Sequence, residues 1–169
     1  MAESGWVTAG SDRPDFSTWA TDKGPDLMRF ALAVTGNAHD AADAVQDALV
    51  AIYTRWRRLS RHGRPDAYAR RVIVNRQISW WRKIGRRESS TQLPDLAGAG
   101  EAATGDAVLA ARLLRTLPAQ QRAAVVLRYL EDLSFADIAE ILGCPESTAR
   151  SHVHRALGRL REQLGDEHD

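Results

Sequence analysis

Four polar side chains near the end of the sequence have the types and the spacing needed to bind a ligand outside the chain. At about 100° per residue, Ser147, Ser151 and His154 fall on one side of a predicted helix. Arg150 lies at the edge of this side. Hydroxyl and guanidinium groups can hydrogen-bond to base edges in the major groove of duplex DNA. The pattern favours a DNA-reading helix over the alternative, which is the solvated face of an ordinary helical hairpin.

The residues that precede this helix predict the element that positions it. Ser134 and Asp137 have about the spacing of a capping box, and Gly143 can adopt the positive φ that ends a first helix. Pro145 suits the first turn of the next helix, because its missing N–H would have no helical partner there. The second helix has an apolar stripe for packing, formed by Val153, Leu157, Leu160 and Leu164. Two short helices joined by a tight turn predict a helix-turn-helix.

The basic residues of the chain are concentrated in one segment. Residues 55–87 include 12 basic residues and one acidic residue, so this segment carries +11 although the whole chain carries +1. Of the 23 basic residues in the chain 21 are arginine, whose planar head suits bidentate contacts with phosphate and guanine. Such segregation of charge predicts a surface that binds a polyanion.

Aromatic residues lie among these cations. A helix opened by Pro65 is predicted over residues 66–87, and it contains Trp80 and Trp81. Rings beside cations are typical of surfaces that stack the bases of single-stranded nucleic acid. The alternative is that the rings belong to the core, but adjacent residues point about 100° apart, so at least one tryptophan should be exposed. Asn75 is a poor helix former and predicts a polar contact in this helix.

A further helix, predicted over residues 38–59 and capped by Asn37, separates polar from apolar residues. Its acidic side consists of Asp40, Asp43 and Asp47, with Gln46 beside them. Its apolar side consists of Val45, Leu49, Ile52 and Trp56. The acidic side is either a solvated surface or a docking surface for a basic or polar partner helix.

Composition excludes several classes of protein. Cys144 is the only cysteine, so neither an intramolecular disulfide nor a cysteine-rich zinc site can form. The five histidines lack metal-ligand spacing, and the sequence has no phosphate-binding glycine loop and no nucleophile–histidine–acid set. We therefore expect no enzymatic activity, no catalytic residue, no metal and no cofactor. No apolar run approaches the ~20 residues of a membrane span, and no signal peptide is visible, so we expect a cytoplasmic protein without membrane contact.

No strand pattern of any length occurs, so the expected fold class is all-α. The first half should contain a short helix over residues 15–22, a second from Pro25 to Gly36, and a loop over residues 61–64. In the second half, helical patterning resumes near Asp106, breaks at residues 117–118 and continues to Tyr129. We predict two small helical domains, residues 14–88 and 106–165, joined by a flexible linker over residues 89–105, with residues 1–13 disordered.

Three motifs in this order resemble those of extracytoplasmic-function (ECF) sigma factors of bacterial RNA polymerase, of a short type common in actinobacteria. Residues 36–56, GNAHDAADAVQDALVAIYTRW, are similar to regions 2.1–2.2. Residues 67–83, AYARRVIVNRQISWWRK, are similar to regions 2.3–2.4, and residues 117–161 are similar to region 4. The resemblance covers about residues 15–164. It implies a region 2 helical bundle and a region 4 helix-turn-helix.

The resemblance also implies a function and its partners. Such a protein binds core RNA polymerase through the β′ coiled coil and the β flap. It recognises the −35 element as a duplex and the −10 element as a melted strand, and it starts transcription of a specific regulon. An anti-sigma factor would be a further partner.

Residue roles follow by position from the resemblance. The −35 element would be read by Ser147, Thr148, Arg150, Ser151, His154 and Arg155. The −10 element would be bound and melted by Arg61, Arg64, Arg71, Asn75, Arg76, Trp80, Trp81, Arg82 and Lys83, with Asn75 and the loop of residues 61–66 at the flipped base. The polymerase would contact Asp43, Gln46 and Asp47.

Two other interpretations remain open at this point. One is a conventional helix-turn-helix regulator that binds duplex DNA without polymerase. The other is a pure protein-interaction module, such as a sigma-like decoy. The basic, aromatic helix together with the acidic stripe favours the sigma factor, because a simple repressor needs neither.

Overall fold

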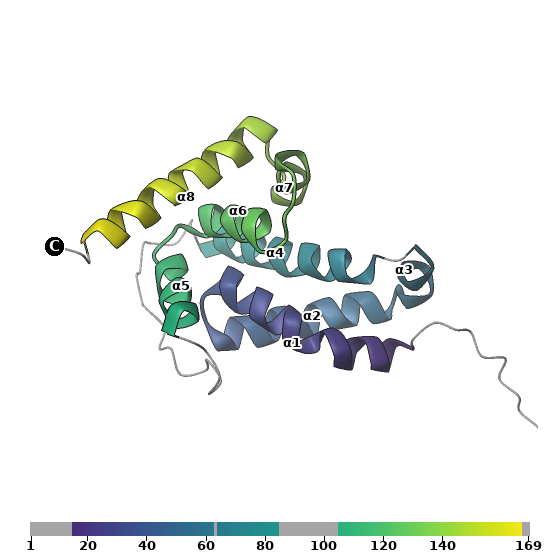
Figure 1. Ribbon diagram of the computed structural model, residues 1–169. Coiled ribbons are helices and arrows are strands. Elements are labelled where there is room, and N and C mark those ends of the chain that lie inside the picture. The colour runs from purple at the N-terminus through teal and green to yellow at the C-terminus, as the bar shows by residue number, and fades with distance from the viewer. Residues whose placement is uncertain (1–14, 63, 85–104, 167–169) are drawn as a thin grey trace, which may run out of the picture.

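The computed structural model describes residues 15–62, 64–84 and 105–166, and these residues form helices and no strand (Figure 1). The helices are α1 (Phe16–Thr35), α2 (Ala38–Tyr53), α3 (Trp56–His62), α4 (Pro65–Ile84), α5 (Gly105–Arg115), α6 (Ala119–Tyr129), α7 (Phe135–Leu142) and α8 (Glu146–Asp166). The all-α class is confirmed. Residues 1–13 and the predicted linker up to residue 104 lie outside the described residues, and Gly105 already belongs to α5.

The helices form two packed units. In the first, α1, α2 and α4 pack on one another, and α3 lies at the end of α2 and α4 (Figure 1). In the second, α6, α7 and α8 pack on one another, and α5 contacts α8. The break predicted at residues 117–118 is confirmed, since α5 ends at Arg115 and α6 begins at Ala119.

The first helix differs from its prediction. The sequence predicted two helices separated before Pro25, whereas the structure has one helix, α1, that runs through this proline. Trp19 lies on one side of the proline and Leu27 on the other, and both are buried in the same core. Burial on both sides holds the two halves in line, which offsets the hydrogen bond that a proline removes from a helix interior.

The helix predicted over residues 38–59 is also wrong in its extent. It begins as expected, with the Asp40 N–H donating to Asn37 Oδ1 at 2.8 Å, but α2 ends at Tyr53. The Arg55 N–H bonds to the Ile52 carbonyl at 2.9 Å, a tighter i→i+3 turn that ends the regular helix. A new helix, α3, then starts at Trp56 and continues through His62, so the first two residues of the predicted loop, Arg61 and His62, are helical.

The break between α2 and α3 brings aromatic rings together. The Trp56 ring lies 5.6 Å from the Trp19 ring and 5.7 Å from the Phe16 ring, measured between centroids. Phe16 also meets Tyr53 edge-on at 5.1 Å. These spacings fall in the range of favourable aromatic pairs. The cluster joins the start of α1 to the turn that ends α2.

The core of the first unit uses small residues on α2. Ala41, Ala44 and Ala48 are at most 1% exposed, and they allow α1 and α4 to approach closely. Of the apolar side predicted for this helix, Val45 and Ile52 are buried and Leu49 is half-buried. The contribution of the alanines was not apparent from apolar periodicity alone.

The core of the second unit lies between α6, α7 and α8. Its fully buried side chains include Leu127, Ile138 and Ala149. In the predicted stripe of α8, Val153 is buried, but Leu164 is 40% exposed. The buried part of the stripe is therefore shorter than predicted, although the adjacent residue, Gln163, still donates to Thr116 Oγ1 at 2.7 Å at the end of α5.

The two units pack against each other, which the sequence did not predict. Helix α6 lies against α1 and α4, and α7 lies against α4 (Figure 1). Two ion pairs cross the interface: Arg70 Nε pairs with Glu131 Oε2, and Arg71 Nη2 lies 3.0 Å from Glu140 Oε1. Arg122 of α6 is 5% exposed, and burial, aided by the nearby charge of Arg115, lowers its pKa to about 10.

Candidate nucleic-acid and protein interfaces

The turn between α7 and α8 has the geometry that the sequence predicts. The Asp137 N–H donates to Ser134 Oγ at 3.1 Å, which caps α7. Gly143 ends the helix at φ +64°, a left-handed conformation that glycine adopts without a steric penalty. The Cys144 N–H then bonds to the Ala139 carbonyl at 3.1 Å, which completes a Schellman motif. These caps fix the direction in which α8 leaves the turn.

Pro145 lies one position earlier than predicted. Helix α8 begins at Glu146, and the Pro145 carbonyl accepts from the N–H groups of Thr148 and Ala149 at 3.0 and 3.1 Å. The carbonyl of the residue just before a helix accepts the first helical bond, so Pro145 is the N-cap rather than part of the first turn.

The predicted reading face of α8 is exposed. Ser147, Arg150, Ser151, His154 and Arg155 are exposed, and Thr148 is half-buried. Arg150 Nη2 lies 2.9 Å from Glu146 Oε1, and the Ser151 hydroxyl donates to the Ser147 carbonyl at 2.9 Å. Five side chains with hydrogen-bonding groups are thus presented on one helix outside the core.

The neighbouring His152 has a different environment. It is half-buried, and its Nδ1 is buried without a hydrogen-bond partner among the described residues. Burial, and to a lesser extent the charge of Arg155, lowers the pKa of the His152 imidazole. His152 therefore belongs to the packing of α8, whereas His154 lies on the exposed face, as predicted from their positions on the helix.

Helix α4 presents a second exposed face. Arg71, Asn75, Ser79 and Lys83, spaced by four residues, are all exposed. Trp80 is 43% exposed, as expected for at least one of the two tryptophans. Trp81 and Arg82 belong to α4, but their side chains lie outside the described residues. Cations and an amide therefore share one side of this helix, and the exposed ring of Trp80 lies about 100° around the helix from Ser79.

Arg76 does not join the other cations of α4. Its Nη1 donates to the Asp43 carbonyl at 3.0 Å and forms an ion pair with Asp47, and its Nη2 lies 3.8 Å from Asp43 Oδ2. The structure thus links one predicted DNA contact to two predicted polymerase contacts. Arg76 fixes α4 against the acidic stripe of α2.

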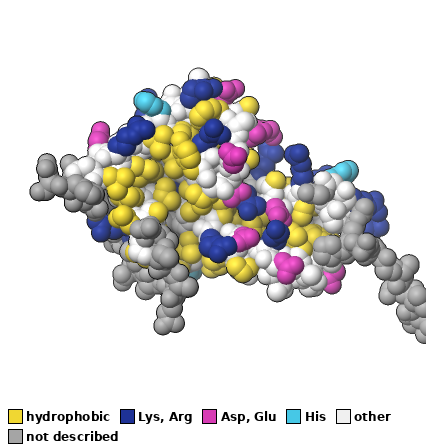
Figure 2. Space-filling model, viewed as in Figure 1, with side chains coloured by type: hydrophobic (Ala, Val, Ile, Leu, Met, Phe, Trp, Pro, Cys, Tyr) yellow, Lys and Arg dark blue, Asp and Glu magenta, His cyan; other side chains and the backbone are white. Residues whose placement is uncertain are grey.

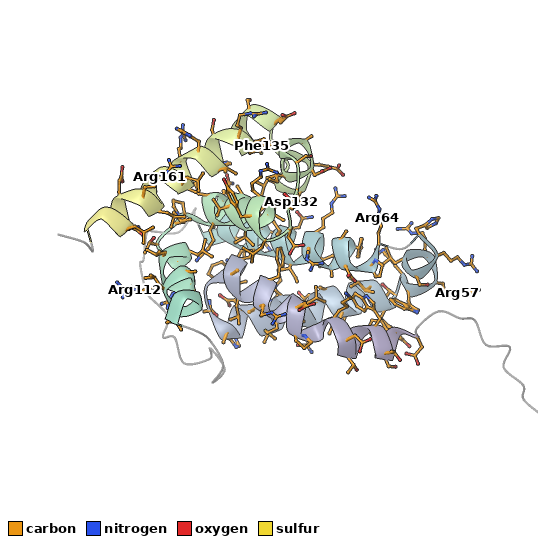
Figure 3. The ribbon with its side chains drawn as sticks, in the orientation of Figure 1. Arg57, Arg64, Arg112, Asp132, Phe135 and Arg161 are labelled. Carbon is orange, nitrogen blue, oxygen red and sulfur yellow. The ribbon has the colours of Figure 1, made fainter. Side chains whose placement is uncertain are left out.

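The loop before α4 and Asn75 lie at different positions along the axis of α4. Arg61 is on α3, and Arg64 precedes α4 directly. Arg64 and Arg57 both extend outward into solvent near the α3 end of the molecule (Figure 3). Ten residues separate Pro65 from Asn75, which corresponds to about 15 Å along the helix axis. That one flipped base contacts both places stays a prediction.

The acidic stripe of α2 continues into exposed apolar residues that sequence reasoning missed. Asp43 is half-buried, and Gln46 and Asp47 are exposed. Val50 is 60% exposed and Tyr53 is 67% exposed. Their spacing from Gln46, by four and seven residues, places them on the same side of the helix. From this spacing, the sequence could have predicted that Val50 and Tyr53 extend the acidic stripe.

A hollow of about 960 Å³ opens between the two units. Its wall from the first unit includes Trp19, Trp56 and Tyr68, and its wall from the second unit includes Glu131 and Glu140. Trp19 also donates from Nε1 to Asp66 Oδ1 at 2.7 Å, which ties α1 to the start of α4. Trp19 was missed because the sequence placed it on a separate short helix.

Basic side chains gather at two places on the face drawn in Figure 2, with acidic side chains among them. Figure 2 shows basic side chains over the α3 end and over the α7–α8 turn.

Among the described residues, no group of histidine, cysteine and acidic side chains could hold a metal ion. Within the same part of the chain, none of the helices has the length and apolar character needed to cross a membrane.

Comparisons with known proteins match both units. Residues 19–87 match the family model of Sigma-70 region 2, and residues 108–160 match that of Sigma-70, region 4. The RNA polymerase sigma-E factor of Streptomyces avermitilis is 37% identical over 89% of this chain and 85% of its own length. The chain belongs to the ECF sigma factors. Its function is promoter-specific initiation of transcription.

More distant relatives agree with this assignment. The ECF RNA polymerase sigma factor SigW of Bacillus subtilis is 28% identical over 83% of each protein. The sigma factor RpoE of Bartonella quintana, solved in complex with the anti-sigma factor NepR, has a TM-score of 0.63 and 28% identity, covering 89% of this chain and 97% of that one. CnrH in complex with the cytosolic domain of CnrY, at 21% identity and a TM-score of 0.56, shares the fold.

The matched ranges assign the helices of this sigma factor. Region 2 spans most of α1 through α4, and region 4 runs from α5 through most of α8. The exposed face of α4 and the acidic stripe of α2 therefore belong to region 2, and the reading face of α8 belongs to region 4. The hollow lies between the two regions.

Proposed function

We propose that this sigma factor uses three separate surfaces. The exposed face of α8 reads the −35 element, the exposed face of α4 binds and melts the −10 element, and the acidic stripe of α2 binds the β′ coiled coil of core RNA polymerase. The observation that carries the proposal is the exposure of the cations, Asn75 and Trp80 together on α4, in the same chain as the capped helix-turn-helix.

Duplex recognition by α8 is supported by the chemistry of its exposed side chains. Arginine can form two hydrogen bonds to guanine O6 and N7, and serine can bond to several bases. Ser147 and Ser151 are at or near the N-terminal end of α8, which is the part of a recognition helix that contacts base edges. Arg155 lies further along and suits a phosphate contact that fixes the helix in the groove.

Strand capture by α4 is supported by energetic reasoning. Taking a base out of a duplex costs a few kcal/mol, and stacking it on an aromatic ring returns ~1–3 kcal/mol. Trp80 supplies such a ring, and Arg71 and Lys83 supply phosphate contacts on the same helix. The free energy of stacking is close to the cost of taking a base out of the duplex. Helix α4 can therefore hold a DNA strand once the duplex is open.

The polymerase is needed as a platform. Two DNA sites held on one rigid body gain from their effective concentration and have a fixed spacing, whereas a flexible linker alone fixes no spacing. The acidic stripe suits a basic or polar partner helix, and the exposed Val50 and Tyr53 add apolar area beside it. The β flap is proposed as the contact of region 4.

Three further expectations complete the proposal. The division into residues 14–88, 89–105 and 106–165 is kept as the domain organisation. The protein is proposed to act in the cytoplasm, with no catalytic step of its own. An anti-sigma factor is proposed as a partner, which is supported by the likeness to RpoE of Bartonella quintana in its complex with NepR.

A binding experiment with core RNA polymerase tests the proposal. The full chain should co-elute with bacterial core polymerase in gel filtration, and Gln46→Arg should weaken this association because it places a cation in the acidic stripe. Glu162→Gln is the matched control on the exposed side of α8, and it should leave the association unchanged. Promoter-duplex binding without any association with polymerase would indicate a conventional regulator. Association without promoter-dependent transcripts would indicate a decoy.

A further inference from the structure

One aromatic ring in region 4 contacts a residue of the reading face. Phe135 is the first residue of α7, and it lies beside α8 (Figure 3). The Arg150 guanidinium carbon lies 4.4 Å from the centre of the Phe135 ring, well within the ~6 Å at which a cation is attracted to an aromatic ring. A second guanidinium, that of Arg128 on α6, lies 5.1 Å from the same centre.

The position of this ring is fixed by the surrounding structure. Ser134 caps α7 immediately before Phe135, and its hydroxyl lies 2.6 Å from Asp137 Oδ2. Arg128 Nη1 donates to the Leu133 carbonyl at 2.8 Å, which holds the segment that leads into the cap. Phe135 is half-buried and packs against the core of region 4. The Phe135 ring is therefore held in place beside the long, flexible side chain of Arg150.

Arg150 is the side chain that gains from such a support. Its side chain is 60% exposed, and a long arginine in water loses rotamer entropy when it binds. The Phe135 ring restricts one side of the guanidinium, and Glu146 Oε1 accepts from Nη2 at 2.9 Å. Ring and carboxylate together favour one orientation of the planar group before any DNA is present.

We propose that Phe135 is a positioning residue that holds Arg150 in the orientation needed to read the −35 element. The inference rests on the proposed function of α8 as the −35 reader. A pre-oriented guanidinium loses less freedom when it makes a bidentate contact with a base. An unsupported one still reaches phosphates, which carry no sequence information. Phe135 therefore acts on discrimination between sequences more than on total affinity for DNA.

The test measures discrimination by the holoenzyme. The probe is a promoter fragment obtained by 5′-end mapping, together with the same fragment in which only the −35 element is scrambled. The ratio of the two dissociation constants is measured for the parent and for Arg150→Ala, Phe135→Leu and the double variant. Arg150→Ala should lower the ratio about 10-fold, as expected for loss of one bidentate base contact. Phe135→Leu should lower it about 3-fold, in line with a half-exposed cation–ring contact.

Two further variants separate positioning from folding. Phe135→Tyr keeps the ring and should keep the ratio within about 2-fold of the parent. Tyr129→Leu removes another ring of region 4, 59% exposed and outside the reading face, and it should leave the ratio unchanged. In the double variant, Phe135→Leu should add nothing to Arg150→Ala, because coupled residues are not additive.

Each other outcome overturns a defined part of the account. If Phe135→Leu lowers the ratio equally with and without Arg150, the ring does not act through Arg150 and the inference is wrong. If Arg150→Ala lowers the ratio but Phe135→Leu leaves it unchanged, the inference is again wrong, whereas the proposed function of α8 stands. If Arg150→Ala leaves the ratio unchanged, the assignment of Arg150 as a reader is wrong, and the inference fails with it.

Discussion

Gly36 and Gly158 show how the same residue type can have opposite roles at two positions. Gly36 ends α1 at φ +83°, and a Cβ built on it would lie 2.5 Å from Nη1 of the buried Arg122. Gly158 is inside α8, and a Cβ there would meet nothing within 4 Å. Position 36 requires glycine because of its left-handed φ and the nearby Arg122 side chain. At position 158 glycine only destabilises the helix relative to alanine.

These two glycines give a matched prediction for stability. Gly36→Ala should lower the free energy of unfolding by about 1–2 kcal/mol or more, since a left-handed conformation is costly for alanine. Gly158→Ala should raise it by about 0.5–1 kcal/mol. Urea unfolding of both variants measures the difference. A Gly36→Ala protein as stable as the parent would contradict the conformation described for the end of α1.

His152 makes the stability of region 4 depend on pH. Its imidazole has a pKa lowered from 6.5 in the folded state, mainly by burial and secondarily by Arg155. Between pH 6.5 and this lowered value the unfolded chain binds more protons than the folded chain. The free energy of unfolding should therefore fall as the pH falls through this window.

The variant His152→Gln should remove this part of the pH dependence. Its urea midpoint should change less between pH 7 and pH 5 than that of the parent. His154→Gln, exposed on the same helix, should retain the slope of the parent. Equal slopes for the parent and His152→Gln would show that this histidine is not responsible.

At the scale of single residues, the sequence predicted which side chains are exposed better than it predicted which side chains contact one another. The hydroxyls and cations of α8 lie outside the core because their positions follow the helical period. The ion pairs of Arg76 with Asp43 and Asp47 join residues about 30 positions apart, and no local pattern encodes them. The Phe135–Arg150 contact was missed for the same reason.

The element that carries most of the proposed melting activity is α4. It exposes Arg71, Asn75 and Lys83 along one side, exposes Trp80 near its C-terminal end, and buries Ile73 and Val74 completely. A helix anchored in this way can present a ring to an unpaired base without moving. Its exposed and buried sides are separate, so the exposed side can be altered without removing the core.

Replacing both Trp80 and Trp81 by alanine should impair melting more than polymerase binding. The loss of ~1–3 kcal/mol of stacking per base corresponds to at least a 5-fold decrease in open complexes. The measurement is permanganate reactivity of unpaired thymines at matched promoter occupancy. Replacement of both by phenylalanine keeps aromatic rings and serves as the control. Unchanged reactivity in the alanine variant would refute the role given to these rings.

Elements were predictable where capping residues define their ends. Asn37, Ser134 and Gly143 lie at helix ends as predicted, because caps satisfy backbone groups locally. The turn after Tyr53 has neither a glycine nor an asparagine to mark it; the Thr54 hydroxyl donates to the Ala51 carbonyl at 3.0 Å, and the Trp56 ring packs with rings of α1. The continuity of α1 through Pro25 is likewise decided by distant burial rather than by local preference.

On the scale of the whole molecule, the packing of region 4 on region 2 is the feature that sequence could not provide. Arg70 and Glu131 are only 22% and 16% exposed in their side chains, whereas Arg71 and Glu140 are 46% and 66% exposed. A partly buried pair cannot lose one member without leaving a charge poorly solvated. An exposed pair contributes ~0–1 kcal/mol, so Arg71 can exchange Glu140 for a phosphate at little cost.

This contrast predicts different effects for two similar substitutions. Glu131→Gln should lower the free energy of unfolding by about 1–3 kcal/mol and raise the radius of gyration, because it leaves Arg70 without its carboxylate. Glu140→Gln should change either quantity little. Urea unfolding and small-angle X-ray scattering measure the two effects. Equally small effects of both would contradict the packing of the two regions.

Transcription reconstituted from this chain and bacterial core RNA polymerase on genomic DNA, followed by 5′-end mapping, tests the central claim most directly. We predict new start sites, each preceded at a constant distance by a shared pair of sequence elements. A set of start sites no different from that of core polymerase alone would contradict the account.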